Sequence, residues 1–277
     1  MSLVVFTGFA GLVLAPGELH PVLSLVAVSC IAFAAGGAGA INMWYDRDID
    51  ALMARTHNRP IPAGRMAPQN ALAFGIFISV IAVIVMGATV NWVAAALLAF
   101  ANVFYIIVYT VWLKRRTPQN IVIGGAAGAM PPLIGWAAVT GTMGLESFAL
   151  FLLIFLWTPP HFWALSLYRA DEYAVAGVPM LPVVVGKTAT RRQILIYSML
   201  LVPVSLAPLA LGIAGAIYAT TAIAMGGVLL FLAYRIITQQ DDGSARRMFQ
   251  YSIFYLFILF LVLIAERLWE LAFVPIQ

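Results

Sequence analysis

The sequence predicts an all-α, polytopic membrane protein that forms a single domain over residues 1–277. Three observations support this fold class. First, 63% of the residues are hydrophobic, only 9% are charged, and the mean hydropathy is +0.99. Second, apolar stretches of about twenty residues, the length that spans a bilayer as a helix, recur along the chain. Third, the basic residues gather in alternate connections between these stretches.

Nine apolar segments are expected to form transmembrane helices. The first is shorter than the usual spanning length. It resembles a signal-peptide core, but no Lys or Arg precedes it, so we interpret it as a first membrane helix that is short or lacks its usual N-terminal flank. Only the stretch from Gly212 to Gly215 separates the seventh segment from the eighth. In order, the segments span residues 2–15, 20–44, 67–89, 92–113, 121–140, 146–168, 193–213, 216–237 and 249–271.

The connections after the second, fourth, sixth and eighth segments hold 14 of the 15 Lys and Arg residues. Cytoplasmic loops of membrane proteins carry an excess of these residues. We therefore expect a protein of the cytoplasmic (inner) membrane with its N-terminus in the cytoplasm and its C-terminus outside. Topology also explains the net charge of +4, so no nucleic-acid partner is predicted. Cys30 is the only cysteine, which excludes a disulfide framework and a thiolate metal site.

One polar stretch, residues 42–66, lies between two apolar segments and holds three of the chain's eleven acids. Such dense charge beside a membrane indicates a site. If the preceding helix continues, Asn42, Asp46 and Asp50 lie one turn apart on one face. An amide and two carboxylates supply the oxygen ligands that Mg²⁺ prefers, and Mg²⁺ commonly takes further ligands from a substrate's phosphates. The spacing therefore predicts a magnesium site.

The same stretch also supplies positive charge. Arg55 and Arg59 lie four residues apart, and both can contact phosphate groups. Asp48 points away from the face shared by the other acids, and we expect it to be solvated or paired.

A second polar cluster follows the sixth segment, where Asp171 and Glu172 precede a loop that contains Pro, Gly and Lys187. Both acidic clusters lie at the expected cytoplasmic ends of even-numbered segments. Two carboxylate clusters that face one cavity would form a diphosphate site with metals on both walls. Two ordinary interfacial loops explain the pattern equally well.

The order of these residues resembles a known family. Asn42-x3-Asp46-x3-Asp50, followed by Arg55-Thr-x2-Arg59-Pro, resembles the first signature of the intramembrane aromatic prenyltransferases, which join isoprenoid diphosphates to aromatic or quinoid acceptors. Within that superfamily the chain is similar to the branch of protohaem IX farnesyltransferases (haem O synthases). The stretches that carry this closer match, which extends over nearly the whole chain, are residues 114–125, 131–136, 158–163 and 171–182.

The resemblance implies nine helices around a central cavity open toward the cytoplasmic side. It implies Mg²⁺ as cofactor, farnesyl diphosphate and haem b as substrates, and haem O as product. It also implies contact with haem A synthase or with terminal oxidase assembly. The expected metal ligands are Asn42, Asp46, Asp50 and Asp171. The expected diphosphate contacts are Arg55, Arg59, Lys114, Arg115 and Lys187.

The second cluster departs from the wider superfamily. Many relatives have two aspartates four residues apart there, whereas this chain has Asp171 and then Val175. This departure argues against a second metal held like the first. A further alternative applies to Lys114 and its two basic neighbours, whose charge is also explained by membrane topology.

His161 lies within an apolar segment, after Thr158-Pro-Pro, where we expect the helix to break and to free backbone groups. An intramembrane histidine is a functional candidate by default. Because imidazole is a common axial ligand of haem iron, His161 is the candidate haem ligand. The alternative is a histidine that only forms a hydrogen bond with a neighbouring helix.

Three functions are compatible with these features: farnesylation of haem, prenylation of a phenolic or quinoid acceptor, and transport of an anion. Most segments carry no charge at their midplane, which argues against a transporter. His161 and the chain-wide resemblance favour haem over a smaller acceptor.

Overall fold

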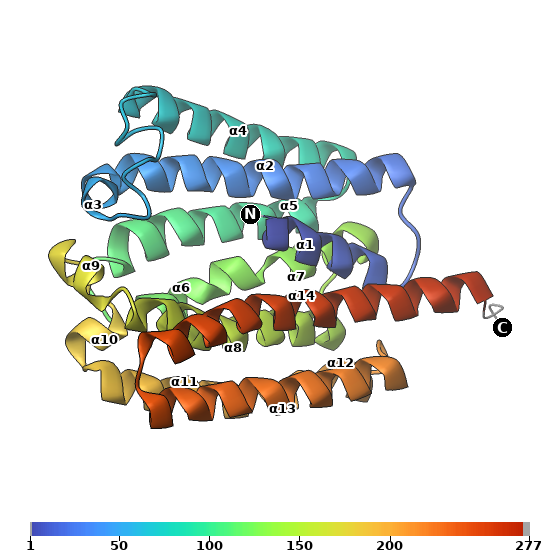
Figure 1. Cartoon of the computed structure of the whole chain (residues 1–277). Helices are drawn as coiled ribbons and strands as arrows, with labels where there is room; N and C mark the ends of the chain where they lie inside the picture. The colour runs from blue at the N-terminus through green and yellow to red at the C-terminus, as the bar shows by residue number, and fades with distance from the viewer. Residues whose placement is uncertain (1, 274–277) are drawn as a thin grey trace.

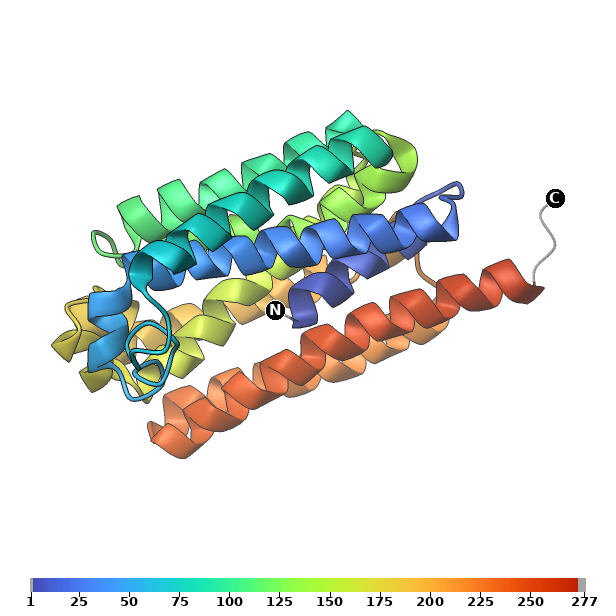
Figure 2. The same cartoon turned by 90° about the horizontal axis from the view of Figure 1, so that it is seen from above.

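The computed structural model describes residues 2–273, which form a bundle of roughly parallel and antiparallel helices (Figures 1 and 2). The helices are α1 Ser2–Leu14, α2 Pro21–Tyr45, α3 Arg47–Leu52, α4 Pro68–Thr89, α5 Trp92–Val103, η1 Phe104–Leu113, α6 Asn120–Ala129, α7 Pro131–Thr140, α8 Leu145–Leu167, α9 Ala170–Val175, α10 Leu181–Val184, α11 Lys187–Val204, α12 Ala207–Ala210, α13 Ala216–Gln239 and α14 Asp242–Phe273.

All nine predicted segments are helical in the described part of the chain. Eight of them are long and apolar enough to cross a membrane, and three of these eight are continuous pairs, α5 with η1, α6 with α7, and α11 with α12. The remaining segment is α1, which has only 13 residues, as its short apolar stretch predicts. The predicted all-α, polytopic fold class is therefore confirmed.

The α6–α7 pair and α8 lie at the centre of the bundle. In the most apolar windows of these two spans 78% and 67% of the residues are buried, against 28–33% for α2, α4, α5–η1, α11–α12 and α13. The outer helices turn large apolar side chains such as Phe77 and Phe231 outward. This pattern fits a surface that faces lipid, because a bilayer does not penalise exposed hydrocarbon.

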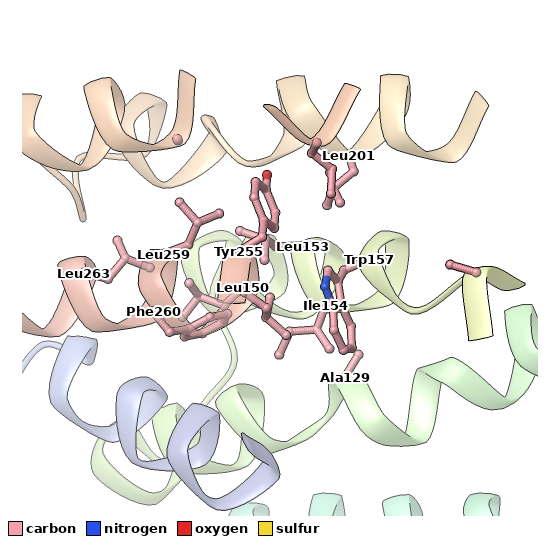
Figure 3. Close-up of a cluster of buried hydrophobic side chains, with 14 of the residues drawn as sticks. Ala129, Leu150, Leu153, Ile154, Trp157, Leu201, Tyr255, Leu259, Phe260 and Leu263 are labelled. Carbon is pink, nitrogen blue, oxygen red and sulfur yellow. The ribbon is translucent and has the colours of Figure 1, made fainter. Parts of the chain in front are cut away.

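The largest part of the hydrophobic core surrounds α8 and α14 and extends to α11 and α13 (Figure 3). Leu150 and Leu153 of α8 pack with Tyr255 and Leu259 of α14, and none of these side chains is exposed to any measurable extent. Trp157 of α8 continues this layer toward Ala129 of α6. The core thereby fixes the position of the α8 residues that follow Trp157.

The predicted break in the sixth segment is wrong. α8 runs from Leu145 to Leu167 without interruption, although Pro159 and Pro160 lie inside it. Proline removes an intrahelical donor, but its fixed φ is close to the helical value. Both prolines are buried, and α6, α11 and α14 all pack against α8. These contacts keep the helix continuous.

α1 crosses α7 at a very short distance because small residues line both sides of the contact. A Cβ atom on Gly11 would overlap the backbone of Pro132, and one on Gly135 would overlap the backbone of Gly8. Glycine at such crossings lets helix backbones approach closely, as in many membrane proteins. The short α1 is therefore held against the centre of the bundle.

The four basic connections lie at the same end of the bundle, on the left in Figure 1, together with α3, α9 and α10. The C-terminal end of α14 lies at the opposite end. Polar connections far apart in the sequence are thus brought together at one mouth of the bundle.

Candidate active site

The first acidic cluster lies where α2 gives way to α3. Helical hydrogen bonds continue through this junction, from the Asp46 N–H to the Asn42 carbonyl oxygen (2.9 Å) and from the Asp50 N–H to the Asp46 carbonyl oxygen (2.8 Å). The three residues therefore lie one turn apart, and all three side chains are buried. The expected common face is confirmed.

Asp46 is fully buried and is surrounded by donors. Its Oδ2 accepts a hydrogen bond from Asn42 Nδ2 (2.8 Å) and forms an ion pair with Lys114 Nζ. Its Oδ1 accepts from Arg115 Nη2 at 3.2 Å. A buried carboxylate requires such partners, because removing it from water is costly unless its charge is balanced. The connection after η1 therefore supplies the cations for the end of α2.

Asp50 forms the second buried ion pair of the cluster. Its Oδ2 lies 2.7 Å from Arg59 Nη1, and the Thr56 hydroxyl donates to the Asp50 carbonyl oxygen at 3.0 Å. These contacts fold the loop after α3 back over the acidic face, which places Arg59 beside the carboxylates.

Asp48 lies on the exposed side of α3, as predicted, and is paired. Arg115 donates to both of its carboxylate oxygens, at 2.7 and 2.8 Å. These bonds hold the pKa of Asp48 down to about 2. The paired carboxylate in turn raises the pKa of Arg115, which also lies 4.9 Å above the ring of Tyr45. Arg115 thus bridges the outer and the buried acid.

A cavity of about 420 Å³ opens beside this cluster, between α1, α2, η1, α6, α8 and α14. Polar groups gather at one end of it, where Asn42, Arg55, Arg59 and Lys114 line the wall. A smaller cavity of about 60 Å³, lined by Asp50, adjoins it, since the two share Arg59, Lys114 and four other lining residues. The buried carboxylate of Asp50 thereby faces the same space as the cations.

Aromatic side chains form much of the remaining wall. Tyr105 and Tyr109 come from η1, with ring centroids 5.4 Å apart, and Trp157 and Phe162 come from α8. η1 is a π-helix, a rare form that is frequent at functional sites. Gly124 of α6 accommodates it, because a Cβ atom there would overlap the ring of Tyr109. Ring faces therefore surround the space next to the cations.

His161 lines the cavity from α8, and a serine hydroxyl holds its ring. The Ser252 hydroxyl oxygen lies 2.7 Å from the Phe249 carbonyl oxygen and 2.7 Å from His161 Nδ1, and when the hydroxyl donates to the carbonyl, Nδ1–H donates to the hydroxyl oxygen. The other ring nitrogen, Nε2, then carries a lone pair. The rings of Trp157 and Phe249, with centroids 4.2 and 4.6 Å from that of His161, hold the imidazole in place.

A profile of the UbiA prenyltransferase family matches residues 4–263. The chain belongs to the UbiA prenyltransferase family. This membership agrees with the acidic and basic signature of residues 42–59, and it decides against the anion-transporter alternative.

Curated members of the family are similar over nearly the whole chain. The protoheme IX farnesyltransferase of Parvibaculum lavamentivorans is 60% identical over 272 residues, which cover 97% of this chain and 86% of that protein. The protein of the same name from Azorhizobium caulinodans is 55% identical over 272 residues, which cover 97% and 89% of the two chains. The predicted resemblance to this branch of the family is confirmed.

Solved structures of UbiA proteins share the fold. A digeranylgeranylglyceryl phosphate synthase structure matches with a TM-score of 0.80 at 18% identity and covers 96% of this chain and 93% of its own. A UbiA homologue from Archaeoglobus fulgidus bound to GPP and Mg²⁺ matches with a TM-score of 0.68 at 16% identity, with coverage of 95% and 96%. The UbiA-like helical bundle is therefore established for this chain.

The second acidic cluster differs from the first in this UbiA chain. Asp171 is exposed on α9, Lys187 is exposed at the start of α11, and neither lines the two cavities at the first cluster. The loop instead approaches through Tyr173 and Met180, which pack against Ile49 of α3. The roles predicted for Asp171 and Lys187 remain predictions.

The first cluster has the donor chemistry that a magnesium ion requires. Among residues 2–273 no group of three His, Cys, Asp or Glu side chains could hold a metal by itself. Mg²⁺, however, usually takes only one or two carboxylates and completes its shell with water and phosphate. Asn42 turns its amide N–H groups to Asp46 and Thr110, because a carboxylate only accepts, and its amide oxygen is directed elsewhere. The donor types therefore fit the ion, with Asn42 and Asp50 lining the cavities and Asp46 directly behind them, paired with Lys114 and Arg115.

Sequence reasoning did not identify several residues that line the cavity, among them Tyr109, Trp157 and Phe162. The signal that was available is the one-turn spacing of Tyr105 and Tyr109 and of Trp157 and His161. In an apolar segment that spacing is equally typical of core packing, so only the structure distinguishes a cavity wall from the core.

Proposed function

We propose that this chain is a protohaem IX farnesyltransferase, which transfers the farnesyl group of farnesyl diphosphate to a vinyl group of haem b and yields haem O and diphosphate. The observation that carries this function is the identity of 54–60% with curated proteins of that name over 96–98% of the chain. The paired charges and the aromatic cavity give it a physical basis.

The ion pairs at the mouth of the cavity are matched to a diphosphate. Arg59 and Lys114 now neutralise Asp50 and Asp46, and both cations line the cavity. An entering diphosphate provides alternative partners for these cations, and Arg55 adds a third. When Arg59 and Lys114 turn to the diphosphate, Asp50 and Asp46 lose their partners. Another positive charge must then balance these two carboxylates.

Asn42, Asp46 and Asp50 would hold Mg²⁺, which balances the negative charge that develops on the diphosphate as its bond to carbon breaks. The protein's own cations act on the same charge, because fixed positive groups aimed at a leaving group stabilise the transition state. Asp171 is proposed as a further metal contact, and Arg115 and Lys187 as outer diphosphate contacts.

The allylic C–O bond breaks with its electron pair leaving on the diphosphate. The farnesyl cation that remains must be kept from water until the acceptor reaches it. The rings of Tyr105, Tyr109 and Phe162 border the cavity next to the cations. Aromatic ring faces attract a cation, so these side chains both shield and stabilise it.

His161 is proposed as the axial ligand of the haem iron, because its side chain lines the cavity and the tautomer with Nδ1–H directed to Ser252 leaves a lone pair on Nε2. Such a bond fixes the vinyl group near the allylic cation. The vinyl π pair forms the new carbon–carbon bond. A water oxygen then bonds to the resulting cation and loses a proton, which leaves the hydroxyl group of the product.

The end of the bundle that holds α3, α9 and α10 is proposed to face the cytoplasm. The basic residues at this end support the assignment. α1 begins partway along the bundle and runs toward the end opposite α3 (Figure 1), so the chain would enter from the cytoplasmic side, and the C-terminus would lie outside, in the inner membrane. The product would pass to an enzyme that modifies haem further, such as haem A synthase, or to terminal oxidase assembly.

The direct test supplies the purified full chain with Mg²⁺, farnesyl diphosphate and either haem b or a phenolic or quinoid acceptor, and reads the products by mass. The expected product is haem b with one farnesyl group and one hydroxyl group added across a vinyl double bond. A prenylated phenol or quinone with haem b unchanged would assign the chain to the alternative acceptor class.

A further inference from the structure

A second cavity of about 220 Å³ adjoins the main one between α1, α2, α5 and the α6–α7 pair. Val4, Tyr105 and Gly128 line both cavities, so the two spaces meet at these residues. No step of the proposed chemistry uses this second cavity.

The walls of the second cavity are hydrocarbon. No charged side chain lines it, and its only side chains with N or O atoms are those of Asn102 and Tyr105. The amide oxygen of Asn102 already accepts from the Ser79 hydroxyl at 3.2 Å. A diphosphate or a haem propionate would be unpaired there, and burying an unpaired charge is very costly. An apolar chain has no such cost.

One face of α2 connects this cavity with the cations. On α2, Ile31, Ala35, Ala38 and Gly39 line the second cavity and Asn42 lines the first, with the helical spacing of one continuous face. From Asn42 to Ile31 this face extends about 16 Å at the usual rise per residue. A chain anchored by its diphosphate beside Asn42 can therefore follow α2 into the second cavity.

Two glycines contribute to the volume of this space. A Cβ atom on Gly39 or on Gly128 would meet no heavy atom within 4 Å. These positions differ from Gly37, where a Cβ atom would overlap Ser79 of α4. Glycine inside a helix is less stable than alanine by roughly 1 kcal/mol. Helix packing does not explain why glycine rather than alanine stands at Gly39 and Gly128. A ligand that occupies the cavity does explain it.

We propose that the second cavity binds the distal isoprene units of the allylic diphosphate, and that Gly39 and Gly128 determine which chain length is accepted. The proposal rests on the proposed function for the position of the diphosphate. Gly128 borders the passage between the cavities, and Gly39 forms part of the wall beyond it. A side chain at either position occupies volume that a longer chain requires.

Calorimetry tests the proposal. It measures how tightly the full chain in detergent, with Mg²⁺, binds non-hydrolysable geranyl and farnesyl thiolodiphosphates. Gly39→Leu is expected to weaken farnesyl binding relative to geranyl binding by at least about tenfold, which corresponds to about 1.4 kcal/mol. Gly227→Leu is the matched control. Gly227 lies on the exposed surface of α13, where a Cβ atom also meets nothing within 4 Å.

The smaller changes Gly39→Ala and Gly128→Ala should shift the same ratio in the same direction, and they keep the test decisive if Gly39→Leu does not fold. An unchanged ratio in these variants, or an equal loss for both chain lengths, overturns the proposal. The measurement needs no acceptor, so it remains valid if haem b is not the substrate. Conversely, haem O production with an unchanged ratio refutes only the role of the cavity.

Discussion

At the scale of single residues, Lys114 and Asp46 have two separable roles. Their ion pair joins the connection after η1 to the end of α2, and Asp46 has no exposed surface. Removing one partner of a buried pair typically costs about 3–5 kcal/mol when the remaining charge is uncompensated, and the loss is smaller here because Arg115 still pairs with Asp46 when Lys114 is removed. The same residues are proposed to bind the diphosphate and Mg²⁺.

A double-mutant cycle separates these roles. Lys114→Met should lower the unfolding temperature of the detergent-solubilised protein, and Asp46→Asn added to it should restore part of the loss, because the buried charge is gone. Neither variant should form product. If the double variant is no more stable than Lys114→Met alone, the ion pair does not stabilise the fold.

His161 supports a prediction about haem. In His161→Ala, titration with haem b should show weaker binding and a shifted Soret band, because the proposed axial ligand is lost. Ser252→Ala should keep the band position but weaken binding by about tenfold, since Ser252 only orients the ring. An unchanged spectrum and affinity in His161→Ala would leave the histidine as a packing residue.

At the scale of elements, a feature could be predicted from the sequence where residues close together in the chain encode it. Asn42, Asp46 and Asp50 belong to one helical repeat, so their common face follows from spacing alone. The partners of Asp46 lie 68 and 69 residues away in the chain, and no local pattern encodes that pairing. Family resemblance named Lys114 and Arg115, but as diphosphate contacts rather than as partners of an acid.

The prediction at α8 was wrong for a similar reason. The local effect of two adjacent prolines predicts a break in the helix. Packing against three neighbouring helices maintains the helix nevertheless. The outward position of Asp171 is also a tertiary effect. Tyr173 and Met180 supply the apolar contacts of that loop with α3, and Asp171 takes the exposed side of α9.

The crossing of α1 and α7 supports a prediction about stability. Gly11→Ala should destabilise the protein by about 1–3 kcal/mol, because the added methyl group forces the two backbones apart. Thermal unfolding in detergent measures the change. Gly227→Ala, which adds the same group at an exposed site on α13, should not lower the unfolding temperature. Equal effects of the two substitutions would show that the crossing tolerates a side chain.

At the scale of the whole molecule, the gathering of polar connections at one end gives the bundle a direction. Labelling of single-cysteine variants with an impermeant maleimide tests that direction in intact cells. Thr142→Cys, at the end opposite to α3, should be labelled without lysis, and Ala54→Cys should be labelled only after it. Both positions are exposed, and the native Cys30 is buried. The reverse pattern would invert the proposed orientation.

The bundle as a whole combines a charged mouth with an apolar, aromatic interior. This combination explains how one chain can hold a diphosphate and protect a cation from water. The central claim is that the buried acids at the mouth, and not negative charge in general, support departure of the diphosphate.

The most direct measurement is the rate of diphosphate release from farnesyl diphosphate by the purified protein with Mg²⁺ and haem b. Asp46→Asn and Asp50→Asn should each lower that rate by at least about a hundredfold, because the leaving group loses its fixed stabilisation. Asp242→Asn, which removes an exposed carboxylate at the same end of the bundle, should change it by no more than about twofold. Wild-type rates in both Asp46→Asn and Asp50→Asn would contradict the claim.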